Sequence, residues 1–165
     1  MSESPRAEHR ESLNLTFRKA TEADVDAFLE LEHAVKPAKT FSGIFDRDEA
    51  LREFTEADVY LIYKDGKLVG STEITMKSPD KAYLAGLVVH PDYEGQGIAR
   101  EAALFRLNLV KDVPHVYLVT HPENEKIKNL YKSLGFIEGE RTENYFGDGE
   151  PRIVMTLNKT AKRAV

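Results

Sequence analysis

The spacing of apolar residues changes several times along the chain, and each change marks a predicted element. Leu13, Leu15 and Phe17 alternate with polar residues, which is the period of a half-buried strand. Thr21 and Asp24 then have the spacing of a helix capping box. By these signals, strands are predicted at about 13–17, 59–63, 67–76, 83–90, 116–120, 136–145 and 152–157, and helices beginning near 21, 46, 97 and 123.

Two of these helices have apolar stripes at helical spacing, and each is expected to pack its stripe against the sheet. The stripe of the earlier helix consists of Ile98, Ala102, Phe105 and Leu109. The stripe of the later helix consists of Ile127, Leu130, Tyr131 and Leu134. The element order β-α-α-β-β-β-α-β-α-β-β predicts an α/β fold with a mixed central sheet of about seven strands and four helices.

The composition is that of one globular domain. The chain has 165 residues, of which 41% are hydrophobic and 31% charged, so it can form a core of useful size. Residues 13–158 are expected to form this domain, between a flexible leader at 1–12 and a tail at 159–165. The net charge of -5 argues against nucleic acid as a partner and favours cationic ligands.

The residue types present also limit the chemistry. With Cys 0, thiolate nucleophiles and thiolate metal sites are excluded, and the five His lack ligand spacing, so we expect no metal. An apolar run of about 18 residues, as a membrane helix requires, does not occur, and the first residues lack the apolar stretch of a signal peptide. We therefore expect a cytoplasmic protein that does not bind membranes.

The segment from Leu87 to Arg100 carries the strongest chemical signal. A buried strand, Leu87-Val88-Val89, is followed by a turn with Gly95 and Gly97 and then by a helix. The first N–H groups of a helix have no partners within it, so such a turn suits a phosphate or pyrophosphate. The alternative is a tight turn that binds nothing. Neither a dinucleotide fingerprint nor a P-loop is present.

Two motifs resemble those of the GNAT N-acetyltransferase superfamily. The turn Glu94-Gly95-Gln96-Gly97-Ile98-Ala99 resembles motif A, Q/R-x-x-G-x-G/A, with Glu94 where the family prefers Gln or Arg. Asn124 followed by Leu130-Tyr131-Lys132-Ser133-Leu134-Gly135-Phe136 resembles motif B. The resemblance extends from about 13 to 157, and its outline is similar to ribosomal-protein alanine and other protein Nα-acetyltransferases.

The resemblance implies acetyl-CoA as co-substrate, bound where the strand Leu87–Val89 parts from the strand at 116–120. Pantetheine would pair with backbone at Leu87 and Val89, and Asn124 would hold its arm. The pyrophosphate would lie on the turn at 95–100. The implied cofactor-binding residues are Leu87, Val88, Val89, Glu94, Gly95, Gln96, Gly97, Ile98, Ala99, Arg100, Asn124, Asn129 and Tyr131.

The resemblance also makes Tyr131 the general acid for the leaving thiolate, although its helical spacing alone would place it in the core. The general base is open. Relatives carry a Glu at positions where this chain has Gly86 or Val119. Glu73, on the strand at 67–76, is the candidate catalytic base, and its alternative is a solvated strand carboxylate. His121 and Glu123 are further candidates for direct or water-mediated deprotonation.

The acceptor is expected to be a small amine or amino-acid-like molecule. The pair Tyr145-Phe146 resembles the aromatic pair that lines the peptide site of protein Nα-acetyltransferases, so a peptide N-terminus is the alternative. The candidate acceptor-site residues are Phe41, Phe45, Glu73, His121, Tyr145 and Phe146. Since a cysteinyl acyl-enzyme is excluded, we expect direct attack in a ternary complex. A non-catalytic acyl-CoA sensor is a further alternative, and a homodimer is left open.

Overall fold

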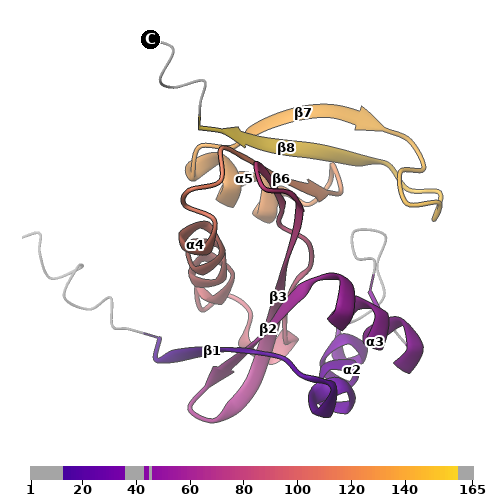
Figure 1. Cartoon of the computed structure of the whole chain (residues 1–165), viewed down its shortest axis with the longest axis vertical. Helices are drawn as coiled ribbons and strands as arrows, with labels where there is room; N and C mark the ends of the chain where they lie inside the picture. Colours follow the sequence, from indigo (N-terminus) through magenta and orange to yellow (C-terminus); the bar gives the residue numbers. More distant parts are fainter. Residues whose placement is uncertain (1–12, 36–42, 45, 160–165) are drawn as a thin grey trace, which may run out of the picture.

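A mostly antiparallel sheet runs through the whole molecule (Figure 1). The computed structural model describes residues 13–35, 43–44 and 46–159, so the predicted leader, Phe41, Phe45 and residues 160–165 lie outside the described residues. Within the described ranges, eight strands and four α-helices are present. They are β1 (Leu15–Lys19), α2 (Val25–Ala34), α3 (Arg47–Glu56), β2 (Asp58–Lys64), β3 (Lys67–Ser78), β4 (Lys81–Tyr83), β5 (Leu87–Val89), α4 (Ile98–Leu109), β6 (His115–Thr120), α5 (Glu125–Ser133), β7 (Ile137–Thr142) and β8 (Arg152–Asn158), with 3₁₀ turns at Glu22–Asp24 and Pro91–Tyr93.

The strand predicted at 83–90 is in fact two strands, and this prediction was wrong. β3 is twelve residues long and pairs with both of them along one edge. Its first part, at 70–72, pairs with β5, and its last part, at 75–78, pairs with β4. Residues 84–86 belong to neither strand. The apolar spacing of 83–90 is continuous through this break, so the sequence pattern did not reveal it.

The break opens the sheet. β4 pairs in parallel with β6 as far as Tyr83 and Tyr117, and the Leu84 N–H donates to the Tyr117 carbonyl at 2.8 Å. Beyond this point β6 pairs only with β8 and β5 only with β3, within the described part of the chain. The sheet order is therefore β1-β2-β3-β4-β6-β8-β7 with β5 outside this path. A wedge opens between β5 and β6.

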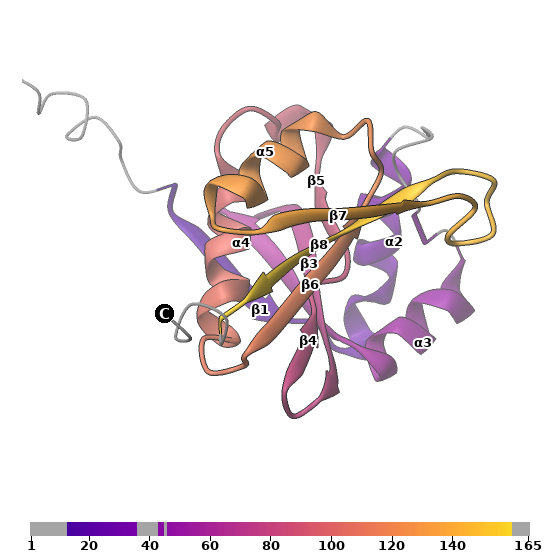
Figure 2. The same cartoon turned by 90° about the horizontal axis from the view of Figure 1, so that it is seen from above.

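Helices cover both faces of the sheet, with α4 on one side and α2 and α3 on the other (Figure 2). The alternation of side chains along β2 produces this arrangement. Leu61 packs in the cluster beneath α2 and α3, whereas the next residue, Ile62, packs against Ile98 and Ala102 of α4. The capping box predicted at Thr21 and Asp24 is present, with the Thr21 N–H donating to Asp24 Oδ2 at 2.8 Å. At the start of α3, Asp46 Oδ1 accepts from the N–H of Glu49 at 2.8 Å.

The third core cluster joins α4 and α5 to β6 and β8. Tyr131 lies in it at 1% exposure, in an edge-to-face contact with Phe136. The predicted stripe of α5 is confirmed, because Ile127, Leu130 and Leu134 also pack against this cluster. At the far edge, β7 is exposed along its whole length and ends three residues before the strand end predicted at 145. Of the helices described, none has the length and apolar character needed to cross a membrane.

Candidate active site

A cavity of about 640 Å³ lies at the wedge between β5 and β6. Its walls include both strands that part there and residues of α2, α3, α4 and α5. Among its lining residues are Glu32, Glu49, Glu53, Glu73, Leu87, Val88, Val89, Glu94, Arg106, Leu118, Val119, Thr120, His121, Asn124, Tyr131, Phe146 and Arg152. Nine of the nineteen sequence-predicted site residues therefore line one cavity, although they come from separate elements of the chain.

The backbone of β5 turns two of its residues toward the wedge. The Gly86 carbonyl accepts from the Glu73 N–H at 3.0 Å, and the His90 N–H donates to the Val69 carbonyl at 2.8 Å. In an antiparallel strand, backbone polar groups point to alternate sides. Since the groups of Gly86 and His90 point to β3, those of Leu87 and Val89 point away from it, into the opening. An extended, amide-bearing ligand could pair with them as an added strand.

The glycine turn before α4 fits an anionic group. Gly95 and Gly97 have φ of 81° and 90°, a left-handed conformation that favours glycine. No side chain in the described part of the chain caps α4, whereas Asn124 caps α5 through Ile127. The first N–H groups of α4 are thus open to a phosphate. The Ile98 side chain is buried in the core, which leaves only its backbone for a ligand.

Arg106 is a functional candidate that the sequence analysis missed. The stripe predicted for α4 placed Phe105 and Leu109 inward, but Leu109 is 46% exposed and Arg106 is 2% exposed. The spacing of 98, 102 and 106 is itself helical, so the position was readable as inward. Its charge, however, favoured an exposed side chain, because arginine is rarely buried without a partner. Instead, Arg106 Nη2 donates to the Tyr131 hydroxyl at 2.5 Å.

The other guanidinium nitrogen of Arg106 binds the backbone where the strands part. Nη1 donates to the carbonyls of Glu73 at 2.9 Å, Ala85 at 2.6 Å and Gly86 at 3.4 Å. Nε has no partner among the described residues. All four acceptors are uncharged groups. Burying a cation without a paired carboxylate costs on the order of several kcal/mol, so this arrangement calls for a reason beyond packing.

Glu73 is buried at 4% exposure, so the alternative of a solvated strand carboxylate was wrong. Its carboxylate lies beside Gly86, where an added Cβ would be 3.2 Å from Glu73 Oε2. Gly86 is the position at which the family resemblance expects a Glu. Here the neighbouring strand supplies a carboxylate to the same space. Burial raises the pKa of Glu73 well above its usual range, and a hydrogen bond with Glu53 adds to this effect.

Three more carboxylates share this wall of the cavity. Glu49 and Glu53 lie one turn apart on α3, and Glu32 comes from α2. Glu32 Oε1 accepts from the Ile44 N–H at 2.9 Å. Burial of Glu32 raises its pKa to about 7, against the opposing effect of that hydrogen bond. The wall is acidic and partly dehydrated, which favours a ligand that brings positive charge.

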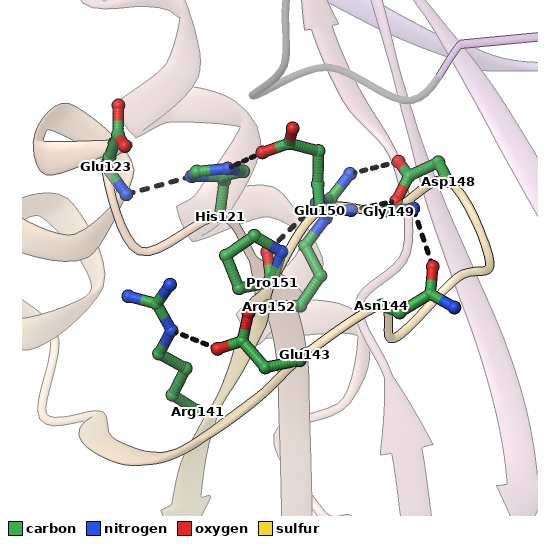
Figure 3. A network of polar contacts seen from close by, with 10 residues as sticks. All are labelled: His121, Glu123, Arg141, Glu143, Asn144, Asp148, Gly149, Glu150, Pro151 and Arg152. Carbon is green, nitrogen blue, oxygen red and sulfur yellow. Dashed lines mark hydrogen bonds and ion pairs between the residues drawn. The ribbon is translucent and has the colours of Figure 1, made fainter.

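His121 lines the cavity, but both of its ring nitrogens are occupied (Figure 3). Nδ1 accepts from the Glu123 N–H at 3.0 Å, which assigns the ring proton to Nε2. Nε2 then donates to Glu150 Oε1 at 2.8 Å. Neither nitrogen has a lone pair open to an amine. A direct role of His121 as the base would require one of these bonds to break, and that hypothesis stays a prediction. In this arrangement His121 ties the 144–150 loop to the end of β6.

The loop between β7 and β8 brings one aromatic residue to the cavity. The Gly149 N–H donates to Asn144 Oδ1 at 2.6 Å, and Arg152 bonds Asp148 at 2.9 Å (Figure 3). The Arg152 guanidinium also lies over the Phe146 ring at 5.2 Å. Phe146 lines the cavity, whereas its neighbour Tyr145 is 41% exposed and lies outside the wall.

Some predicted residues lie outside the cavity wall. Asn129 is exposed on α5, and Arg100 is exposed on α4. The glycine turn at 95–97 is exposed beyond Glu94, which does line the cavity. Phe41 and Phe45 lie outside the described residues. Within the ranges that the structure describes, no group of three or more His, Asp or Glu side chains is arranged to hold a metal ion.

Comparisons with known proteins identify the family and the fold. Residues 25–136 match the model of the acetyltransferase (GNAT) family. The chain is 27% identical over 144 residues to spermidine N(1)-acetyltransferase of Escherichia coli (strain K12). The matched region covers 82% of this chain and 69% of that protein. Among solved structures, ribosomal-protein-S18-alanine N-acetyltransferase from Escherichia coli has a TM-score of 0.72 at 22% identity, covering 87% of this chain and 93% of that one. A GNAT family acetyltransferase from Elizabethkingia anophelis with acetyl-CoA bound has a TM-score of 0.72 at 16% identity, covering 89% and 99%.

The buried Glu32 leads to a prediction about stability. With a folded pKa of about 7, raised from 4.5, Glu32 holds a proton between these values that the unfolded chain has lost. Its contribution to the free energy of unfolding therefore falls as the pH rises through this window. Glu32→Gln should be more stable than the wild type by roughly 1–3 kcal/mol at about pH 8 and by much less at about pH 5. Denaturant unfolding at both pH values measures this difference.

Glu30→Gln is the matched control, because Glu30 lies on the same helix with its side chain exposed. We expect it to change stability by the same small amount at both pH values. An equal effect of Glu32→Gln at both pH values would contradict the assignment of a raised pKa to Glu32.

Proposed function

Because the chain belongs to the acetyltransferase (GNAT) family of acetyl-CoA-dependent enzymes, we propose that it transfers the acetyl group directly to the primary amine of a small, cationic acceptor in a ternary complex. One observation carries this proposal. The cavity at the wedge is lined by a buried carboxylate, Glu73, and a buried phenol, Tyr131. The strand β5, whose backbone groups at Leu87 and Val89 point into the opening, lines the same cavity. These are the groups that amine acylation from a thioester requires.

Acetyl-CoA would be held mainly by backbone groups. Leu87 and Val89 would pair with the pantetheine amides, and the open N–H groups at the start of α4 would bind the pyrophosphate. Asn124 lines the same cavity, and its Oδ1 is already used to cap α5, so only its amide N–H groups would remain for the pantetheine arm. The side chain of Ile98 would take no part. This set is smaller than the one that the sequence resemblance implied.

Glu73 would act as the general base. An amine is mostly protonated near neutral pH, and only the neutral form attacks a carbonyl carbon. A carboxylate with a raised pKa is a stronger base than an ordinary one, and burial beside Glu53 gives Glu73 this property. The amine nitrogen would form the new C–N bond while its proton passes to Glu73, directly or through one water.

Tyr131 would act as the general acid. As the C–S bond breaks, the sulfur takes the phenolic proton and leaves as a neutral thiol. The proton that Glu73 takes from the attacking nitrogen then restores the phenol. The proton that the ammonium form loses before attack passes to solvent, so charge and protons balance over one turnover. Since the chain has Cys 0, no cysteinyl acyl-enzyme intervenes.

The acidic wall supports an acceptor with more than one positive charge. Glu32, Glu49 and Glu53 lie along the cavity beyond Glu73, at the side formed by α2 and α3. A linear diamine or polyamine could present one amine to Glu73 and a second ammonium group to this wall. The similarity to a spermidine N(1)-acetyltransferase is consistent with such an acceptor. The homodimer left open by the sequence concerns a second copy of the chain and stays open.

A peptide N-terminus is the second candidate acceptor, and the aromatic residues of the 144–150 loop favour it. Phe146 is 47% exposed and lines the cavity, while Tyr145 packs against it edge-to-face. A peptide could lie across this pair with its N-terminus in the wedge. It would carry one positive charge at the reacting end and so make less use of the acidic wall.

An acceptor panel tests the proposed function. Purified protein with acetyl-CoA is given spermidine, n-butylamine or an alanine-starting tripeptide, and thiol release is followed. We expect spermidine to have the highest kcat/KM, by at least about tenfold over n-butylamine, because the second ammonium group adds attraction in a partly dehydrated site. A preference for the tripeptide would favour the peptide acceptor. Binding of acetyl-CoA with no thiol release from any acceptor would favour the sensor.

Glu73→Gln tests the base. It should lower kcat by about 100-fold or more, because a positioned base contributes this much to proton transfer. The affinity for acetyl-CoA, measured by calorimetry, should stay unchanged. Glu101→Gln, at an exposed position of α4, is the control and should keep wild-type kcat. Wild-type turnover in Glu73→Gln would remove Glu73 from the mechanism.

Glu49→Gln tests the acidic wall without touching the base. It should raise KM for spermidine by about 3- to 10-fold and leave KM for n-butylamine unchanged, since only the polyamine reaches the wall. Glu56→Gln is the matched control on the same helix, outside the cavity lining. An equal rise in KM for both amines would contradict the role of the wall in charge recognition.

A further inference from the structure

The proton transfers proposed for Glu73 and Tyr131 leave one group unused, the most deeply buried cation in the described part of the chain. Arg106, on α4, is 2% exposed and bonds to residues of β3 and α5. Nη2 bonds the Tyr131 hydroxyl, and Nη1 bonds the backbone carbonyl of Glu73, the residue whose side chain is the proposed base. Its hydrogen bonds in the described residues are all to neutral acceptors, and its positive charge acts on the nearby Glu73 carboxyl, where it partly opposes the rise in pKa that burial causes.

We propose that Arg106 is a positioning residue for proton donation by Tyr131: it binds the phenol oxygen, directs the phenolic proton into the cavity, and stabilises the phenolate that remains after transfer. This inference rests on the proposed function, because it requires Tyr131 to be the general acid.

The hydrogen-bond inventory of a phenol supports the first part. A phenol has one proton to donate and lone pairs that accept. Arg106 can only donate, so the Tyr131 oxygen accepts in their bond and keeps its own proton free. Among the described residues, no acceptor for that proton is present, and Tyr131 lines the cavity. The proton is therefore available to a group that enters the cavity.

The charge of the guanidinium supports the second part. Arginine stays protonated in proteins, and its planar fork is held here from the Nη1 side by the three carbonyls. When the sulfur takes the phenolic proton, a negative charge appears on an oxygen already bonded to a cation. The acceptor of this hydrogen bond changes from a neutral phenol to a negatively charged phenolate, while the donor is a cation throughout. This change strengthens the bond most where water is excluded. No reorganisation of Arg106 is needed.

The same arrangement allows a purely structural role. Residues 84–86 leave the strand ladder, and Arg106 satisfies the Ala85 and Gly86 carbonyls at that break. In this alternative, Arg106 would hold the wedge open and its contact with Tyr131 would have no consequence for turnover. The two roles differ in one measurable respect. Only a positioning role makes the effect of Arg106 depend on the hydroxyl of Tyr131.

A double-mutant cycle measures that dependence. The variants are Arg106→Met, Tyr131→Phe and the double variant, assayed for kcat and for acetyl-CoA affinity with the best acceptor of the panel. Met keeps an unbranched side chain in the space and removes the charge. We expect Arg106→Met to lower kcat about 10- to 100-fold when Tyr131 is intact and less than about threefold when it is combined with Tyr131→Phe. The affinity for acetyl-CoA should change by less than about threefold.

An equal loss of kcat in both backgrounds, or no loss in either, would overturn the proposal. Val110→Ala is the control for stability, because the Val110 side chain is buried at the end of α4 and does not line the cavity. It should lower the melting temperature and keep wild-type kcat. If Arg106→Met does not fold, Arg106→Lys runs the same cycle, since Lys keeps a cation but lacks the fork that joins the carbonyls to the phenol.

A readout independent of activity tests the geometry. In NMR spectra of arginine-labelled protein, the Nη1 and Nη2 groups of Arg106 should give separate signals, because their bonds prevent rotation. Tyr131→Phe should move the Nη2 signal and leave Nη1 in place. One averaged signal would overturn the inference. A wild-type chain that acetylates no amine would refute the proposed function and this inference with it, whereas an active wild type with an additive cycle refutes this inference alone.

Discussion

The site depends on one constraint of strand pairing: a single edge of β3 serves two strands. Twelve residues of β3 are long enough for both β4 and β5, but these two strands do not continue the same ladder on their other side. β4 pairs with β6, whereas β5 does not. Because backbone polar groups must be satisfied, the parting of the strands creates both an opening and a set of carbonyls in need of donors.

The buried polar groups around the wedge follow from that parting. Arg106 reaches the freed carbonyls from α4, and the same guanidinium then meets the Tyr131 hydroxyl from α5. Gly86, at the break, leaves room for the Glu73 carboxylate of the adjacent strand. The same few residues therefore contribute to core packing, to the hydrogen bonding of buried polar groups and to the proposed chemistry. A substitution at any of these residues would act on more than one of the three, which is why cycles with matched controls are needed.

The candidate site was partly predictable from sequence, and its local parts were predicted best. The strand, glycine turn and helix at 87–100 are consecutive in the chain, and so is the stretch from Asn124 to Phe136. Contacts between distant segments were not predictable in the same way. Glu73 was named as a base candidate, but its burial depends on Gly86, which lies beyond the next strand of the chain. The hydrogen bond that occupies His121 Nε2 comes from Glu150, in a loop that follows the next helix and strand of the chain.

By itself, the sequence determined the number, order and type of most elements and the local motifs. Hydrophobic period, caps and turns act over a few residues, and they are readable without knowing the fold. Tertiary structure alone decided that residues 83–90 form two strands, that buried acceptors surround the Arg106 guanidinium and that Glu73 is buried. These outcomes depend on which strands pair and in what register. Pairing free energy belongs to two segments at once, so neither segment's own pattern contains it.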